Sequence, residues 1–402
     1  MSPPIEFLNA CMNQPAPAPR KSWSWRSQAF RSVIYQIIAI GAVIGVIAIL
    51  THNTLLNMAE RGIQSGFDFL TDPAGFDIGE TPIPYESTQS YIKAFFVGLV
   101  NTLRVAVLGI ILTTIWGTLL GVGRFSRNAL VRALCTVYVE FFRNVPVLIQ
   151  LLLWYFLLTH LLPDSWAPWK VGPFFLSKGG LTFPEPAWAM GHATAALGLI
   201  AGVIASRLYL RRAQQHFEAS GQSRSTFWMP LLIVLGFGIL GWLLGGAPLE
   251  FNAPHKGEFA VEGGGSVTPE FLAVTLGLTI YTSAFVAEVV RAGIQSVHHG
   301  QAEAAAALGL NKAQEMRLIM LPQALRVIIP PVTNQYLNLT KNSSLAVAVG
   351  YPDIVSVTNT ALNQTGRAVE CIAIVMLVYL TTSLSTSALM NWYNKRSAIL
   401  ER

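Results

Sequence analysis

Long apolar runs recur along this chain, and each approaches the length that a helix needs to cross a lipid bilayer. A helix takes about 20 predominantly apolar residues to cross the hydrocarbon core. Eight runs qualify, with approximate bounds 33–50, 94–121, 145–162, 187–206, 229–247, 271–293, 327–357 and 370–391. A backbone in lipid must satisfy its own hydrogen bonds, so the pattern predicts an all-α integral membrane protein.

The composition agrees with lipid as the solvent. The mean hydropathy is +0.47, and only 12% of the 402 residues are charged, against about 25% in a typical soluble domain. The net charge of +6 does not call for a nucleic-acid partner, because Lys and Arg collect in cytoplasmic loops. The first run lacks a small-residue cleavage pattern after it, so we read it as an uncleaved span.

Charge then orients the spans. Basic residues concentrate before residue 33 and in the segments 122–144, 207–228 and 291–326, and the alternate loops are richer in acid. The positive-inside rule therefore predicts an inner-membrane protein with eight spans and both termini in the cytoplasm. The Pro-rich start, Pro15–Pro19, reads as a flexible tail.

Small and hydroxyl residues within the spans predict how the helices pack. GxxxG spacings occur at Gly117/Gly121 and at Gly241/Gly245, and such spacings permit close helix approach. The stretch Thr381–Ser387 is expected to hydrogen-bond across helices. The three cysteines are far apart and lack CxxC spacing, which gives no disulfide framework or metal site.

A polar helical hairpin is predicted between the sixth and seventh runs. Gln301–Leu308 consists almost entirely of helix formers, and Gly309 is suited to the left-handed turn that ends a helix. Asn311 is placed to cap a second helix with Gln314 in capping-box position, and Pro322 is expected to disrupt that helix. The spacing alone leaves two readings open, a hairpin that merely connects spans and a docking surface for another protein.

The hairpin resembles the EAA loop of binding-protein-dependent ABC importers. The match follows the spacing EAA-x3-G-x9-I-x-LP and falls on Glu303, Ala304, Ala305, Gly309, Ile319, Leu321 and Pro322. The flanking segments Tyr138–Pro146, Glu288–Ile294 and Lys341–Leu345 look like the polar amino acid permease branch, which includes the histidine and glutamine permeases. The long N-terminal region and the insertion are similar to the larger permease subunits of general L-amino-acid systems.

This resemblance implies a type I ABC importer permease that translocates L-amino acids delivered by a periplasmic binding protein. It also implies a second, similar permease subunit and two copies of a cytoplasmic ATPase, which uses the ATP; this chain itself would bind no cofactor. The organisation implied is a cytoplasmic tail (1–32), an extra span with an external loop (33–93), the permease domain (94–392) and a second tail (393–402). The permease domain would hold inserted spans at about 163–269 and the coupling loop at 300–322.

Charged and polar residues inside the apolar runs are candidate passage residues. Arg104 either attracts the α-carboxylate of a translocating amino acid or pairs structurally, because an unpaired charge in lipid is costly. Lys341, which follows Asn338, either lines the passage or caps a broken helix. Glu288 and Arg291, three residues apart, are expected to form a structural ion pair.

Other function classes fit less well. The chain has no G-x4-GK[ST], HExxH or GxSxG motif, so an enzyme is not expected. An ion-coupled secondary transporter is the main alternative, but such proteins place carboxylates or unwound helices at mid-membrane, and acidic residues are scarce in these runs. A noncatalytic membrane assembly factor would also explain a docking hairpin.

Overall fold

The computed structural model describes residues 28–60, 62, 65–222, 225, 228–258 and 260–397. By contact, the chain divides into two compact units, residues 1–66 and 67–402, and each is described by itself. The predicted flexible tail at Pro15–Pro19 lies outside the described residues, as do most of the predicted N-terminal tail and the last five residues of the chain.

The described part of the first unit is the helix α2 (Gln28–Glu60). Its section Phe30–Met58 is apolar and long enough to span a membrane, and it contains the predicted first span. Apolar side chains on all sides of it are exposed, among them Tyr35, Ile38 and Leu50. A helix that is apolar all round requires an apolar environment, which agrees with a membrane span.

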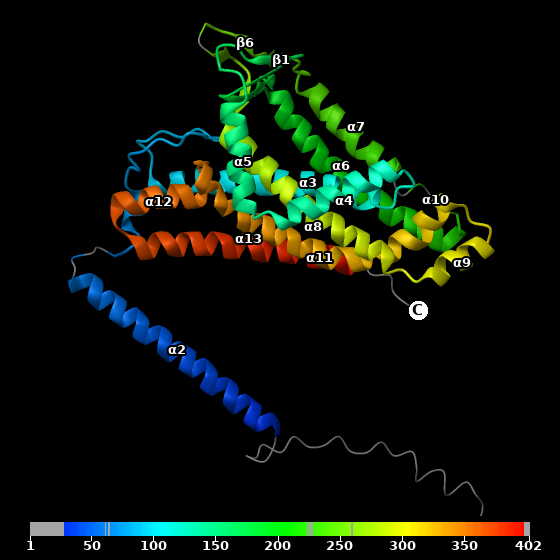
Figure 1. Cartoon of the computed structure of the whole chain (residues 1–402), viewed down its shortest axis with the longest axis horizontal. Coiled ribbons are helices and arrows are strands. Elements are labelled where there is room, and N and C mark those ends of the chain that lie inside the picture. Colours follow the sequence, from blue (N-terminus) through cyan, green and yellow to red (C-terminus); the bar gives the residue numbers. More distant parts are fainter. Residues whose placement is uncertain are drawn as a thin grey trace, which may run out of the picture. The chain divides into compact units, whose positions relative to one another are not determined.

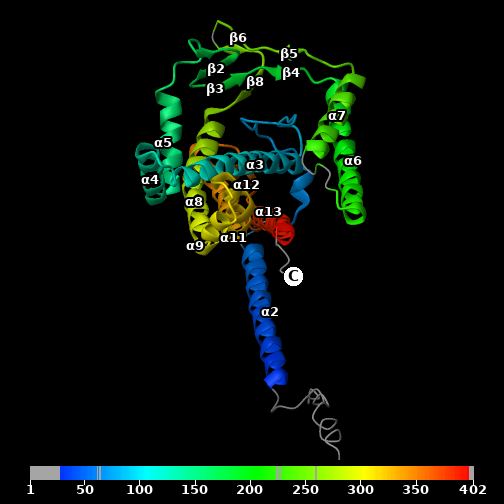
Figure 2. The same ribbon diagram turned by 90° about the vertical axis from the view of Figure 1, so that its right-hand side faces the viewer.

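Helices make up most of the second unit (Figures 1 and 2). The longer ones are α3 (Tyr91–Gly123), α4 (Ala129–Asn144), α5 (Val147–His160), α6 (Met190–Ser220), α7 (Trp228–Leu244), α8 (Pro269–Gln295), α11 (Leu321–Asn342), α12 (Ile354–Thr365) and α13 (Ala368–Ser397). The shorter ones are η1 (Asp68–Thr71), α9 (His299–Ala307), α10 (Lys312–Glu315), the π-helical η2 (Met316–Met320) and the 3₁₀ segment η3 (Ser343–Val349). Buried side chains of α3, α5, α8 and α11 share one core, with Val105, Leu151, Leu278 and Leu339 fully buried.

The prediction of a helical membrane protein is confirmed. Among the described residues, five helices are long and apolar enough to cross a membrane, or seven if each of two bent pairs counts as one span. One pair is α4 with α5, bent by 108°, and the other is Lys312–Val349 with Ile354–Thr365, bent by 53°. The predicted third span, 145–162, is only the 14-residue α5, because Pro146 has an extended ψ of 136° that separates it from α4.

Short strands lie in the inserted region between α5 and α8. They are β1 (Trp169–Val171), β2 (Phe174–Ser177), β3 (Gly180–Phe183), β4 (Glu185–Pro186), β5 (Phe251–Asn252), β6 (His255–Lys256), β7 (Val261–Glu262) and β8 (Gly265–Val267). Antiparallel pairing gives the sheet β1-β2-β3-β8 and the two ribbons β4-β5 and β6-β7. Figure 2 shows β4 and β5 leading toward the α6–α7 pair. Strands of two to four residues carry too little alternation to be read from sequence.

Glycines bring two helix pairs into close contact, as the GxxxG spacings predict. A Cβ atom added at Gly117 would lie 2.7 Å from Val286 Cβ, and one at Gly121 would lie 2.8 Å from Ala287 O, so α3 packs directly on α8. A Cβ atom added at Gly241 would lie 2.3 Å from Thr194 O, so α7 packs directly on α6 in the same way.

The expected cross-helix hydrogen bonds of Thr381–Ser387 are not formed by its threonines. The hydroxyls of Thr381, Thr382 and Thr386 donate to the carbonyls of Leu377, Val378 and Thr382, four residues earlier in α13. The prediction was wrong for these three because a helical threonine reaches a carbonyl of its own preceding turn before it reaches a neighbouring helix.

Candidate coupling hairpin and passage residues

A left-handed turn at Gly309 closes the predicted hairpin between α9 and α10. Gly309 has φ +73°, and two backbone bonds close the end of α9: Leu310 N donates to Ala305 O at 3.1 Å, and Gly309 N donates to Ala306 O at 3.0 Å. This pair of bonds is the Schellman motif, which favours glycine at the left-handed position. The predicted role of Gly309 as the helix-ending residue is confirmed.

The second arm of the hairpin begins with a complete capping box. Gln314 N donates to Asn311 Oδ1 at 2.9 Å, and Asn311 N donates to Gln314 Oε1 at 3.0 Å. Both bonds satisfy amide groups that have no partner within the helix. The predicted cap is confirmed, and it fixes the direction in which α10 leaves the turn.

Pro322 does not end the second arm, contrary to expectation. The α-helical hydrogen bonds change to a π-turn over Met316–Met320, with Leu321 N bonded to Met316 O, and α11 then begins with Pro322 in its first positions. A proline is tolerated there because its missing N–H is not needed in the first turn. The chain therefore remains helical from Lys312 to Asn342.

Both arms of the hairpin are anchored to the membrane helices. Gln323 Nε2 donates to Gln301 Oε1 at 3.3 Å, which joins the start of α11 to α9. A Cβ atom added at Gly293 would lie 2.2 Å from Ile328 Cγ1, so the end of α8 and the start of α11 are in close contact. A force on the hairpin would consequently reach α8 and α11 directly.

The residues of the EAA match divide into exposed and packed positions. The Glu303 side chain is 73% exposed, with His299 Nδ1 3.1 Å from its Oε1, and Ala304 is also exposed. Leu308, at the turn, is 77% exposed. Ala305 is fully buried, and Ile319 and Pro322 are half-buried. Leu321 of the match is 42% exposed, and the nearby Met316 and Leu318 are exposed too. The exposed surface of the hairpin thus presents small side chains, the Glu303 carboxylate and several large apolar residues.

A cluster of arginines surrounds Glu288 near the end of α8; we call it the Glu288 cluster. Glu288 accepts hydrogen bonds from Arg124 and Arg291, and Arg143 Nη1 lies 3.7 Å from its Oε2. The predicted Glu288–Arg291 pair is confirmed. Arg124 and Arg143 come from α3 and α4, and only their basic character was visible in the sequence. Both precede Glu288 by more than 140 residues, so local spacing could not assign them as partners.

Arg104 pairs with an acidic residue of the preceding loop. Its Nη1 lies 2.8 Å from Glu80 Oε1, and its guanidinium carbon lies 4.7 Å from the centre of the Phe271 ring. The other Glu80 oxygen accepts a 2.6 Å hydrogen bond from Thr268. The Arg104 side chain is 31% exposed and lines an open, otherwise apolar cleft of about 670 Å³ between α3, β3, β8 and the start of α8.

The other two candidate passage residues lie on α11. Asn338 and Lys341 are exposed, and Lys341 occupies the last turn of α11, directly before η3. A cation at that position is favourable for the helix dipole. Among the described residues, no hydrogen bond or ion pair joins Arg104 to either of them.

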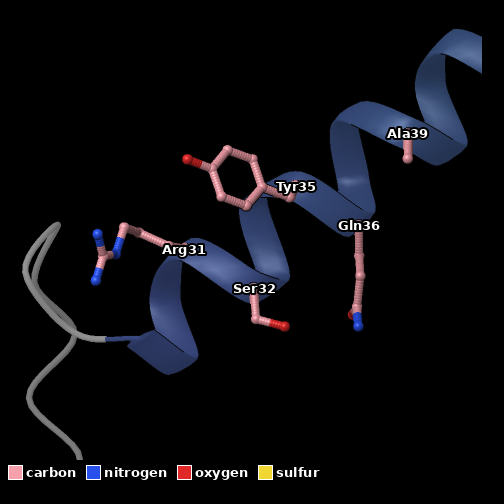
Figure 3. A pocket seen from close by; sticks show the side chains of 5 residues that line it. All are labelled: Arg31, Ser32, Tyr35, Gln36 and Ala39. Carbon is pink, nitrogen blue, oxygen red and sulfur yellow. The ribbon is translucent and has the colours of Figure 1, made fainter.

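Neither the hollow along α2 nor the arrangement of metal-ligating side chains in the described residues forms a candidate functional site. A shallow hollow along α2 is lined by Arg31, Ser32, Tyr35, Gln36 and Ala39, all from one helix (Figure 3). Within the described residues, no group of three or more His, Cys, Asp or Glu side chains is placed to hold a metal ion.

The fold defines a helical membrane protein with an anchored, partly exposed hairpin between two of its apolar helices, a surface that another protein can engage. Comparison with known proteins identifies the class of membrane protein. Residues 109–399 match the family described as binding-protein-dependent transport system inner membrane component, and the chain belongs to this family.

Three relatives cover almost the whole chain. It is similar to the general L-amino acid transport system permease protein AapQ of Rhizobium johnstonii, with 45% identity over 94% of this chain and 96% of that protein. The putative amino-acid ABC transporter permease protein YhdX of Escherichia coli is 44% identical over 95% of this chain and 98% of its own length. The glutamate/glutamine/aspartate/asparagine transport system permease protein BztB of Rhodobacter capsulatus is 40% identical, over 93% and 95%.

Family membership decides between the function classes left open by the sequence. The chain is an inner-membrane transporter component that works with a binding protein, and it is not an enzyme. The ion-coupled secondary transporter finds no support in the family or its relatives.

Proposed function

We propose that this chain is the permease subunit of an ATP-driven importer of L-amino acids. In this proposal a periplasmic binding protein delivers the amino acid, and a separate cytoplasmic ABC ATPase supplies the energy. The printed names of the three relatives support an amino-acid substrate, and two of them specify general L-amino acids or the acidic amino acids and their amides.

The exposed face of the hairpin is the observation on which this function chiefly rests. Glu303 and Leu308 project from a hairpin whose turn is fixed by backbone hydrogen bonds and whose cap is fixed by bonds from backbone amides to side-chain oxygens. Small alanine side chains between them would let the hairpin enter a cleft on the ATPase, where Glu303 would meet a basic residue and Leu308 an apolar one. The packed motif residues Ala305, Ile319 and Pro322 would hold the hairpin in shape, and the exposed Leu321 would add to its apolar contact with the ATPase.

The proposed mechanism couples the hairpin to two states of the membrane domain. Closure of the ATPase dimer would displace the hairpin, and its contacts with α8 and α11 would carry the displacement into the membrane helices. This drives transport only if the ATPase contacts differ between the inward-open and outward-open states. We also propose a second, similar permease subunit, two ATPase copies and cytoplasmic termini, following the charge distribution of the loops.

Arg104, Asn338 and Lys341 are proposed to contribute to the substrate passage. Arg104 presents a partly exposed guanidinium to a cleft, and one of its donors is held by Glu80. A guanidinium has five N–H donors, so others remain for the α-carboxylate of an amino acid. Lys341 has no ion pair with a described residue, which leaves its charge available.

Purification with partners followed by reconstitution tests the function. The tagged chain, extracted in mild detergent from its own host, is expected to retain a P-loop ATPase and a second permease in near-stoichiometric amounts. In proteoliposomes with the binding protein, this complex is expected to import L-glutamine only when ATP is present. Purification alone, with uptake driven by an ion gradient, would contradict the proposal.

A further inference from the structure

The Glu288 cluster connects three helices at one carboxylate. Arg124 is the residue that ends α3, Arg143 lies in the last turn of α4, and Arg291 follows Glu288 by three residues on α8. Arg124 and Arg291 donate directly to the carboxylate, and Arg143 approaches it to 3.7 Å. One side chain thus meets guanidinium groups from the ends of α3 and α4 and from α8 itself.

The cluster is partly shielded from solvent and unbalanced in charge. The Arg124 side chain is 13% exposed and that of Glu288 24% exposed, so water screens their attraction less than at an open surface. Three guanidinium groups surround one carboxylate, and the second acid nearby, Glu140, lies 4.0 Å from Arg124 and is 59% exposed. Loss of the Glu288 charge would leave three arginines repelling one another.

The neighbouring contacts show how α4 depends on this cluster. The α3–α8 contact is secured independently by Gly117 and Gly121. The α4–α8 contact has an apolar part, in which the fully buried Val139 packs with Ala287, and a polar part. In the polar part, Tyr138 donates to Ile280 O at 3.0 Å, and Arg143 lies 5.4 Å from the Phe285 ring. The α4 helix turns by 108° into α5, and its last turn, which contains Arg143, meets α8 through the charged Glu288 and the Phe285 ring.

The cluster also lies on the path from the hairpin into the membrane. Glu288 stands seven residues before the end of α8 at Gln295, about two helical turns, and α9 begins four residues after that end. A displacement of the hairpin that travels along α8 therefore reaches Glu288 within about two helical turns.

We propose that Glu288 is a positioning residue that makes α3 and α4 move together with α8 when the ATPase displaces the hairpin. This inference rests on the proposed function. Its three arginine contacts transmit the displacement from α8 to the end of α4. Without the carboxylate, α8 would still follow the hairpin, but the end of α4 would follow α8 less closely, and ATP hydrolysis would proceed without the full change in the membrane domain.

The test compares Glu288→Gln with Glu140→Gln in the complete complex in proteoliposomes. Both variants remove one carboxylate charge beside Arg124, but only Glu288 bridges the three helices. Amino acid imported per ATP hydrolysed is expected to fall about tenfold in Glu288→Gln, as for loss of a charge-assisted contact. It should stay within about twofold of the wild type in Glu140→Gln, as for an exposed ion pair. Both variants should retain the ATPase on purification.

Two further measurements keep the test decisive if Glu288→Gln does not assemble. Arg143→Gln removes only the arginine that α4 contributes to the cluster and should give an intermediate loss of import per ATP. Glu288→Asp keeps the carboxylate and should retain most of the import per ATP that Glu288→Gln loses. The second measurement is the distance between spin labels at Leu134 on α4 and Ser296 after α8. In the wild type this distance should be the same with and without trapped ATP. That distance should change on ATP trapping in Arg143→Gln.

The outcomes separate this inference from the proposed function. If the wild-type complex imports L-glutamine with ATP but Glu288→Gln and Glu140→Gln give the same import per ATP, the inference is wrong and the function stands. The inference is also wrong if ATP trapping changes the distance between the labels at Leu134 and Ser296 by the same amount in the wild type and in Arg143→Gln. If the wild-type complex shows no ATP-dependent import, the proposed function itself fails.

Discussion

Arg104 and Glu80 form an ion pair between α3 and the loop that precedes it, with 2.8 Å between Nη1 and Oε1. The Glu80 carboxylate is buried, at 8% exposure, and Thr268 at the start of α8 donates to its second oxygen. One carboxylate therefore joins the loop before α3, α3 itself and the start of α8. The structural role and the passage role proposed for Arg104 are compatible, because the pair occupies only part of the guanidinium.

The two roles of Arg104 are separable by a double variant. Arg104→Gln is expected to lower the free energy of unfolding by about 1–3 kcal/mol, because it leaves a buried carboxylate without its cation. Glu80→Gln combined with Arg104→Gln should recover most of that stability, since no unpaired charge remains. Thermal unfolding in detergent measures both. Amino acid uptake should stay low in the double variant; its full recovery would show that Arg104 acts only structurally.

Gly309→Asp is expected to abolish transport while the protein remains in the membrane. No described atom lies within 4 Å of a Cβ atom added at Gly309, so the new side chain points away from this chain, toward the proposed ATPase surface. A charge there would also lie unfavourably at the C-terminus of α9. Uptake and membrane content by immunoblot are the measurements.

Gly221→Asp is the matched control for Gly309→Asp. Gly221 ends α6 with φ +70° and equally open surroundings, so the backbone strain is the same but the hairpin is unaffected. We expect near-normal uptake. Normal uptake in Gly309→Asp, at normal protein level, would exclude the coupling role of the hairpin.

Glu303→Lys should weaken binding of the ATPase without affecting the fold. The side chain is 73% exposed, so its replacement costs this chain little, whereas reversed charge at an interface reduces affinity about tenfold or more. ATPase retained at increasing salt concentration during purification measures the effect. The same substitution at Glu86, an exposed residue of the loop before α3, should leave ATPase retention unchanged; an equal loss there would point to a nonspecific charge effect.

The Asp68–Arg367 ion pair predicts a pH-dependent contribution to stability. The hydrogen bond from Arg367 holds the pKa of Asp68 below its ordinary value of 3.8. A lowered folded-state pKa stabilises the folded protein above the ordinary pKa, and this contribution is lost as the pH falls through the lower folded-state value. Asp68→Asn should therefore lower the Tm at pH 7, and the difference from wild type should shrink below about pH 4. A difference that grows on acidification would contradict the assignment.

Gly121→Ala should destabilise the protein by about 1–3 kcal/mol through overpacking. A Cβ atom there would lie 2.8 Å from both Ala287 O and Val290 Cβ, leaving no room between α3 and α8. Gly41→Ala, in α2, is the control because no described atom lies within 4 Å of its added Cβ, and alanine favours a helix over glycine. Thermal unfolding compares them, and equal Tm values would rule out tight packing at Gly121.

Several features of the hairpin and the helices were predictable because they depend on residues close in the sequence. The left-handed turn at Gly309 and the capping box of Asn311 and Gln314 each involve backbone groups within five residues. The Gly117/Gly121 spacing likewise puts both glycines on one side of a helix, whatever that helix packs against. The apolar runs predicted the helical membrane fold because their length alone matches the bilayer.

The tertiary structure decided the partners that lie far apart along the chain. Glu80 as the partner of Arg104, and Arg124 and Arg143 as partners of Glu288, depend on how α3, α4 and α8 pack. The hydroxyls of Thr381 and Thr386 were assigned to neighbouring helices from composition, yet bond within their own helix. By itself, the sequence determined which segments are apolar enough to enter a membrane and where the hairpin turns, because apolar length and turn chemistry are local. Only the folded chain determined which charges meet, because one carboxylate can pair with any arginine that packing brings within hydrogen-bond distance.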